Sequence, residues 1–323
     1  MYRGKRAAVM LVALAVALKA PVVGAEYTDL FGEKLSQVGA LTLTLAAASV
    51  PKQPAQKPKV WVLHYVNREP KEPESALPTY TAADAETIKL GGKSTYTPDK
   101  AALLTKPLPF SADTGVLIMH THTSEAYTQS AGYTYSESDP LRTTDTAQSV
   151  VRVGQAVAEV LREKGVFCLH DTSFNDYPDY NGAYARSLEN TQNALKEYPS
   201  CFVILDLHRD ATEDADGNPT GQTVETAEGA AARCMLVVGT DEGGLRHDFW
   251  QDNLCFALKL QAEAERIAPG LMKPIDLRTE RFNQHLRPGA ILIEVGSTGN
   301  TLPEALASGR ILARALLAVL GKG

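Results

Sequence analysis

From Gly115 to the C-terminus, short apolar runs alternate with longer segments of helical periodicity, and this alternation constrains the fold more than any other feature. The apolar runs predict five buried strands, at residues 116–119, 166–169, 202–207, 235–238 and 290–295. Four further segments predict helices, the first capped at Thr144 or Asp145 and ending at 164, the others at 184–198, 249–267 and 303–320. Strands that alternate with helices in this way predict an α/β fold, with a mostly parallel sheet flanked by helices on both faces.

The N-terminal end carries an export pattern. Basic residues in the first six positions are followed by the apolar run Ala7–Leu18, and Val23–Ala25 has the small residues of a cleavage site. The apolar run is short for a bilayer span, so residues 1–25 predict either a signal peptide or a membrane anchor. In both cases the mature domain would work outside the cytoplasm, in the cell wall or held at the membrane.

Residues 26–111 predict an N-terminal region and spacer. Residues 51–78 are rich in proline and lysine, which favours an extended and poorly packed chain. A short strand is expected within it at Val60–Leu63. Residues 112–323 are then expected to form one catalytic domain.

Charge and cysteine content narrow the class of protein further. The net charge of -6 argues against a nucleic-acid partner, because phosphate neutralisation needs clustered lysine and arginine. The four cysteines lie far apart, without C-x-x-C spacing, inside apolar runs. They predict buried free thiols rather than a zinc ribbon or a redox motif.

Polar side chains gather where the predicted strands end, which is where ligands bind in sheets of this kind. These strand ends hold His120, His122, Glu125, His208, Arg209, Asp210 and Glu294. Histidine and carboxylate ligands around an open position are what a catalytic zinc site requires. An unpaired Glu294 in an apolar strand would be costly to ionise, and a nearby metal or cation removes that cost.

The same residues suggest roles. His122, His208 and Glu125 are candidate zinc ligands, with His120 and Asp145 as alternatives. Zinc would activate water and polarise an amide carbonyl, while Glu294 would take a proton from the water and deliver it to the leaving amine. Arg209 could contact the substrate or a developing oxyanion.

Other hydrolytic and nucleotide-binding chemistries lack their motifs. The sequence has no G-x-S-x-G elbow, no G-x-G-x-x-G or phosphate loop, and no H-E-x-x-H helix. A noncatalytic wall-binding scaffold is the rival from another class, although binding alone does not need a poised carboxylate.

Four ordered segments resemble the signatures of the stage II sporulation protein P family. They are Val116–Tyr127 (VLIMHTHTSEAY), Arg142–Asp145 with Val150–Gly154 (RTTD, VVRVG), Ile204–Asp210 (ILDLHRD), and Phe282–Gln284 with Pro288–Gly296 and Asn300–Thr301 (FNQ, PGAILIEVG, NT). The resemblance covers about residues 113–320.

This resemblance implies an extracytoplasmic zinc amidase that cuts the N-acetylmuramoyl-L-alanine bond of peptidoglycan, with endopeptidase action on cross-links also attributed to the family. It implies a role in engulfment during sporulation. It further implies two partners, a lytic transglycosylase and a membrane protein that localises both enzymes. A zinc peptidase that cleaves another amide stays open, since the chemistry would be the same.

The resemblance also implies a ligand register. In zinc amidases the first ligand histidine follows the first strand after a short turn, which favours His122 over His120. His208 matches the third ligand and Glu294 the catalytic glutamate. For the acidic second ligand we favour Glu125, although Asp145 and Glu137 lie nearer the expected distance along the chain.

Overall fold

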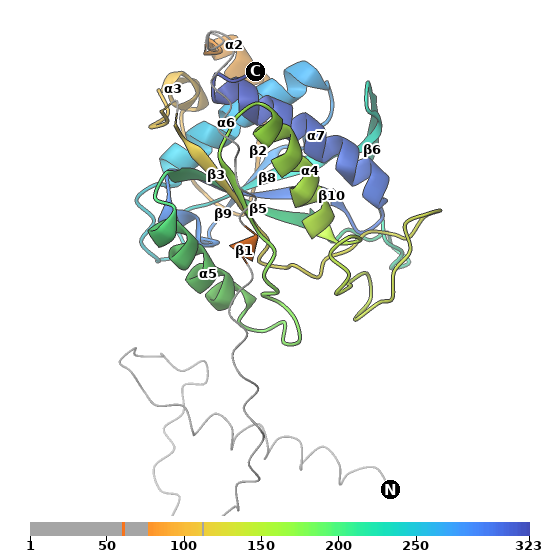
Figure 1. Ribbon diagram of the computed structural model, residues 1–323. Helices are drawn as coiled ribbons and strands as arrows, with labels where there is room; N and C mark the ends of the chain where they lie inside the picture. The colour runs from red at the N-terminus through yellow and green to blue at the C-terminus, as the bar shows by residue number, and fades with distance from the viewer. Residues whose placement is uncertain (1–59, 62–76, 112) are drawn as a thin grey trace, which may run out of the picture. The chain divides into compact units, whose positions relative to one another are not determined.

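The computed structural model describes residues 60–61, 77–111 and 113–323, and Figure 1 shows their arrangement. An eight-stranded sheet forms the centre, in the order β1-β4-β3-β5-β10-β8-β9-β2. Neighbours pair in parallel except β1 with β4 and β10 with β8, which pair antiparallel. The fold is therefore the expected α/β fold with a mostly parallel sheet.

The strands vary from two to ten residues. In sheet order they are β1 (Val60–Trp61), β4 (Cys168–Asp171), β3 (Gly115–Met119), β5 (Cys201–Asp210), β10 (Gly289–Ser297), β8 (Cys234–Gly239), β9 (Ile275–Arg278) and β2 (Leu90–Gly92). A separate hairpin contains β6 (Thr223–Thr226) and β7 (Gly229–Ala232). The five strands predicted after Gly115 are all confirmed, whereas β2, β9 and the hairpin are too short or too poor in apolar residues for their pattern to reveal them.

The four long helices are also confirmed: α4 (Val150–Glu163), α5 (Ala183–Glu197), α6 (Trp250–Ile267) and α7 (Leu302–Val319). The predicted start of α4 at Thr144 or Asp145 is wrong. Ser149 caps this helix through its hydroxyl, which accepts from the Val151 N–H, while Asp145 accepts from the Ala147 N–H in the preceding turn. Both residues can cap a backbone amide, so composition alone did not separate them.

Helices cover both faces of the sheet, but unequally. α4, α6 and α7 pack together on one face over the larger core, and α5 lies on the opposite face (Figure 1). Side chains alternate between the faces along each strand. In β5, Val203, Leu205 and Leu207 enter the larger core, so Asp206 and His208 lie on the face that carries α5.

The segment predicted as a spacer contributes structure near its C-terminal end. Helices α2 (Ala82–Thr87) and α3 (Lys100–Thr105) pack on the larger core, and β2 pairs with β9 at the sheet edge. The described residues 60–61, 77–111 and 113–323 all belong to one compact unit. The predicted signal over 1–25 and most of the spacer lie outside the described residues.

Two further sequence expectations bear on the described part of the chain. All four cysteines are buried and free, as expected. No helix in the described ranges has the length and apolar character to cross a membrane.

A glycine in α4 allows this helix to pass closely over two buried histidines. His120 Nε2 lies 2.9 Å from His170 Nε2, and both rings are buried beneath the helix. A Cβ atom added at Gly154 would lie 2.6 Å from His170 Nε2 and 2.7 Å from His120 Nε2. Close packing leaves no room there for a side chain.

We therefore expect Gly154→Val to lower the free energy of unfolding by about 2–3 kcal/mol through overpacking. Chemical denaturation of the full chain measures this change. Glu159→Val, on the exposed side of the same helix, introduces the same β-branched residue without the clash and should cost about 0.5 kcal/mol or less. Equal losses in the two variants would contradict the packing argument.

Candidate active site

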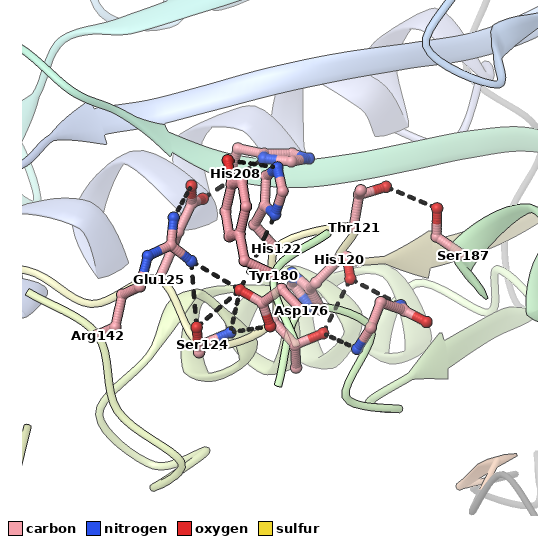
Figure 2. A network of polar contacts seen from close by, with 12 residues as sticks. His120, Thr121, His122, Ser124, Glu125, Arg142, Asp176, Tyr180, Ser187 and His208 are labelled. Atoms are coloured by element: carbon pink, nitrogen blue, oxygen red, sulfur yellow. Dashed lines mark hydrogen bonds and ion pairs between the residues drawn. The ribbon is translucent and has the colours of Figure 1, made fainter. Parts of the chain in front are cut away.

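Polar residues at or just after the carboxyl ends of three adjacent parallel strands lie close together. His122 and Glu125 come from the turns after β3, His208 from β5, and Glu294 from β10, directly opposite His208 in the strand register. Figure 2 shows His122, Glu125 and His208 turned toward one another. The expected site at the carboxyl ends of the strands thus exists as a cluster of buried side chains.

His208 lies between two buried carboxylates. Its Nδ1 is 3.4 Å from Glu125 Oε2, and its Nε2 is 2.9 Å from Asp206 Oδ1, close enough for an ion pair but out of line for a hydrogen bond. Burial opposes a charged imidazole, yet the charge of Asp206 and the contacts with both carboxylates raise the pKa of His208 well above its usual value. The cluster is built to hold positive charge at this point.

Glu125 is held as a carboxylate. Burial opposes its ionisation, but the contact with His208 and the nearby charges of His208 and Arg209 lower its pKa to about 2. The Arg209 N–H also donates to Glu125 Oε2 at 3.1 Å, and Arg142 Nη2 lies 3.5 Å from Glu125 Oε1. Its side chain is therefore both charged and fixed in place.

His122 is oriented by its neighbours and is neutral. Its ring centroid lies 5.3 Å from that of His208, and the ring stacks on Tyr180 with centroids 4.6 Å apart. The Tyr180 hydroxyl lies 3.3 Å from Nε2, while Nδ1 points toward Asp176 Oδ2 at 3.9 Å. Burial lowers the pKa of His122, which favours the neutral imidazole that metals bind.

His120 has a different place. It lies on the α4 side, where Nδ1 is 2.9 Å from the Leu207 carbonyl and Nε2 contacts His170. The carbonyl can only accept, so Nδ1 carries the proton and His120 Nε2 accepts from His170. With both ring nitrogens engaged, His120 does not join His122 and His208.

The alternative acidic ligands also lie elsewhere. Asp145 and Glu137 are exposed, and each accepts from a nearby backbone N–H, that of Ala147 and that of Leu141. Of the three carboxylates considered, Glu125 is the one that the structure brings to His208. Distance along the chain was a poor guide here because the turn after β3 folds back directly onto β5.

Glu294 is a half-buried residue whose carboxyl oxygen Oε2 is buried and unpartnered. Its Oε2 has no hydrogen-bond partner, and burial raises its pKa to about 8. The strand bulges immediately afterwards, where Gly296 has a φ of +75°, a conformation that suits glycine. The bulge ends regular pairing beside Glu294, and the carboxyl group is poised to exchange a proton.

Arg209 takes part through its backbone rather than its guanidinium. The side chain is 6% exposed, and it donates from Nε to the Ala126 carbonyl at 2.8 Å and from Nη2 to the Leu141 carbonyl at 3.0 Å. It alternates with His208 along β5 and so leaves the strand on the opposite face. The expectation that its guanidinium contacts the substrate is not supported by this arrangement.

A polar network supports the cluster. Asp176 is fully buried and accepts from the N–H and hydroxyl of Ser124 and from Arg142 Nη1, the latter at 2.7 Å. The Arg142 guanidinium lies 4.9 Å above the Tyr180 ring, so arginine, tyrosine and His122 form a stack (Figure 2). Sequence reasoning missed Arg142, Asp176 and Tyr180 as site residues, and only Arg142 lay in a recognised motif.

The donor types fit a zinc ion. Two imidazoles and a carboxylate face one another, and Oε2 of Glu294, which pairs with His208 in the strand register, is a buried atom without a hydrogen-bond partner. In the described ranges, however, no three histidine, cysteine or carboxylate side chains already form a group that could hold a metal. His122, Glu125 and His208 supply the right atoms, but their side chains are not oriented as a finished ligand cage.

The sequence matches the family described as Stage II sporulation protein P over residues 53–317. The chain belongs to the stage II sporulation protein P family. The match includes all four segments that carry the resemblance, and it includes His122, Glu125, His208 and Glu294.

Solved structures with some similarity are amidases. They include Ami1 of Mycobacterium smegmatis (14% identity, 66% of this chain and 100% of that chain, TM-score 0.39) and AmiC2 of Nostoc punctiforme (14%, 62% and 95%, 0.35). CwlD of Clostridioides difficile in complex with the lipoprotein GerS is another (12%, 64% and 95%, 0.36). No curated protein sequence matches the chain.

Asp176 offers a test of the support for His122. We expect Asp176→Asn to weaken zinc binding about 10- to 100-fold, because removing the charge behind a ligand histidine loosens its orientation. Competition with a chromophoric chelator measures the affinity. Asp179→Asn, an exposed change in the same loop, should leave it unchanged. Equal zinc affinity in Asp176→Asn and the unsubstituted chain would show that Asp176 does not orient His122.

Proposed function

We propose that this protein is a zinc-dependent N-acetylmuramoyl-L-alanine amidase that acts on peptidoglycan outside the cytoplasm. The observation that carries the proposal is the meeting of His122, Glu125 and His208 with the unpartnered carboxyl group of Glu294 at the carboxyl ends of three adjacent strands. Family membership supports a hydrolase of peptidoglycan, and the side chains supply the donor types of metal-assisted amide hydrolysis.

In this proposal, His122, Glu125 and His208 hold the zinc ion. When bound, the ion would supply a Lewis acid that polarises the scissile carbonyl and lowers the pKa of water. His122 would present Nε2, since its Nδ1 faces Asp176. Asp206, beside His208 Nε2, would orient the second imidazole in the same way.

Glu294 is proposed as the general base and acid. In the metal-free chain burial raises the pKa of the Glu294 carboxyl to about 8, and a zinc ion beside it would lower that pKa, so the group could both accept and donate a proton near neutral pH. It would accept the proton of the attacking water and donate it to the nitrogen of the leaving L-alanine.

The biological setting follows from the family. We propose export through residues 1–25, as a signal peptide or anchor, and a role in peptidoglycan remodelling during engulfment. A lytic transglycosylase and a membrane localising protein are the proposed partners. Cleavage of peptide cross-links is a second activity that the same residues could perform, since it too is amide hydrolysis.

Digestion of intact peptidoglycan by the zinc-loaded full chain tests the proposal. Mass spectrometry should find free stem peptides and glycan strands stripped of them. We expect Glu294→Gln and His208→Ala to lower the rate at least 100-fold, and chelation of zinc to abolish it. Glu197→Gln, at the exposed end of α5, should retain full activity.

The other outcomes identify other functions. Cleaved cross-links alone would make the protein an endopeptidase. Release of neither product by a chain that binds peptidoglycan but not zinc would leave a noncatalytic wall-binding scaffold. Full activity in Glu294→Gln would remove this residue from the reaction.

A further inference from the structure

A groove continues from the candidate active site across the half of the sheet that α5 leaves open. Its volume is about 480 Å³, and its lining includes Gly91, Gln222, Met235, Lys273, Asp276 and Ser297. Met235 pairs with Glu294 across β8 and β10, so the two side chains lie on the same face. The groove therefore begins directly beside the proposed general acid.

The strand register shows that this face of the sheet continues from β8 to β9 and β2. Val237 pairs with Asp276 across β8 and β9, and Asp276 pairs with Gly91 across β9 and β2. The main helical cover on this face is α5, which packs over β3, β4 and β5. Gly91 adds no side chain, and a Cβ atom there would find its nearest neighbour 3.9 Å away. The result is a shallow path that crosses the strands away from His208.

Among the described residues that line it, the groove offers one cation that a ligand could use. The backbone N–H of Lys273 donates to the Cys234 carbonyl, which fixes the chain just before β9. The Lys273 side chain is partly exposed. Its Nζ has a single ion-pair partner among the described residues, Asp210 Oδ2, at a long 3.4 Å. An ammonium has three donors, so it can bind a ligand oxygen and keep this contact.

The other charged side chains that line the groove are an arginine with three hydrogen bonds and an aspartate, which repels anions. Arg233 donates to the Gly270 and Met272 carbonyls and to Gln222 Oε1. Asp276 Oδ2 lies 3.4 Å from Arg278 Nη1. Lys273 is thus the group in this groove best placed to attract an anion.

The chemistry of the proposed reaction gives the direction of the substrate, and this step rests on that function. The scissile carbonyl would lie near His122 and His208, and the leaving nitrogen would lie near Glu294. The chain attached to that nitrogen is the peptide, so the peptide continues from Glu294 over Met235. Two strand spacings separate β10 from β9, about 10 Å, which about three extended residues span.

We infer that this groove binds the stem peptide and that Lys273 pairs with the α-carboxylate of an acidic residue at its second position. Lys273 is then a specificity residue that touches the peptide and takes no part in bond cleavage. Loss of its charge weakens binding of acidic peptides and has little effect on peptides whose carboxylate is amidated.

Calorimetry on the zinc-loaded full chain tests this, with Glu294→Gln present throughout so that no ligand is cut. The ligands are N-acetyl-L-alanyl-γ-D-glutamyl-L-lysine and the same peptide with the glutamyl α-carboxylate amidated. Lys273→Gln should raise the Kd of the acidic peptide about tenfold and leave that of the amidated peptide unchanged. Lys273→Arg should retain most of the affinity, which shows that the position tolerates substitution.

The matched control is Lys196→Gln, an exposed lysine at the end of α5, which should bind both peptides normally. The inference is overturned if Lys273→Gln loses the same affinity for both peptides, or loses none. It is also overturned if neither peptide binds the chain in which Lys273 is intact. Peptidoglycan digestion by the unsubstituted chain separates the two proposals. Charge-dependent peptide binding without digestion removes the amidase and keeps the groove, whereas digestion without that dependence does the reverse.

Discussion

The contact of His208 with two buried carboxylates is the interaction around which the site is organised. Glu125 and Asp206 stand on either side of the ring, and neither could remain ionised in a buried place without positive charge. The same contact joins the turns after β3 to β5, because Glu125 also accepts from the Arg209 N–H. A site that needs a cation in order to be stable is well suited to metal chemistry, and this links the packing of the strands to the proposed function.

The polar network on the far side of His122 has a related role. Arg142 bridges Glu125 and Asp176, so the segment around Arg142, the turn after β3 and the loop that carries Asp176 are held by one guanidinium. Arg209 also holds loop segments in place, because its guanidinium donates to the carbonyls of Ala126 and Leu141. Each arginine sits behind the cluster, and both support the side chains that would meet the substrate.

Sequence reasoning reached the strands, the long helices, and His122, Glu125, His208 and Glu294 as candidates, because buried strands and the residues at their ends leave clear patterns. It did not reach Asp176 or Tyr180, whose loop has no periodicity and meets His122 only in three dimensions. It also gave the guanidinium of Arg209 a substrate role, since a motif shows that a residue is near a site but not which face of the strand it occupies.

Gln284 illustrates the opposite case. It lies in a family signature, yet it is buried and bonds to the backbone of Gly239 and Val237, so its role is structural.

The reversal of strand direction between β10 and β8 has a consequence for how such an enzyme can diversify. The residues proposed to cut the bond come from the ends of β3, β5 and β10, while the groove draws mainly on the beginnings of β8, β9 and β2 and on the segments before them. Lys273, just before β9, and Asp276 in β9 come from a part of the chain that carries none of the residues proposed to cut the bond. Insertions or substitutions in the segments before β8 and β9 could therefore change which cell-wall peptide is accepted while the reaction centre keeps its geometry.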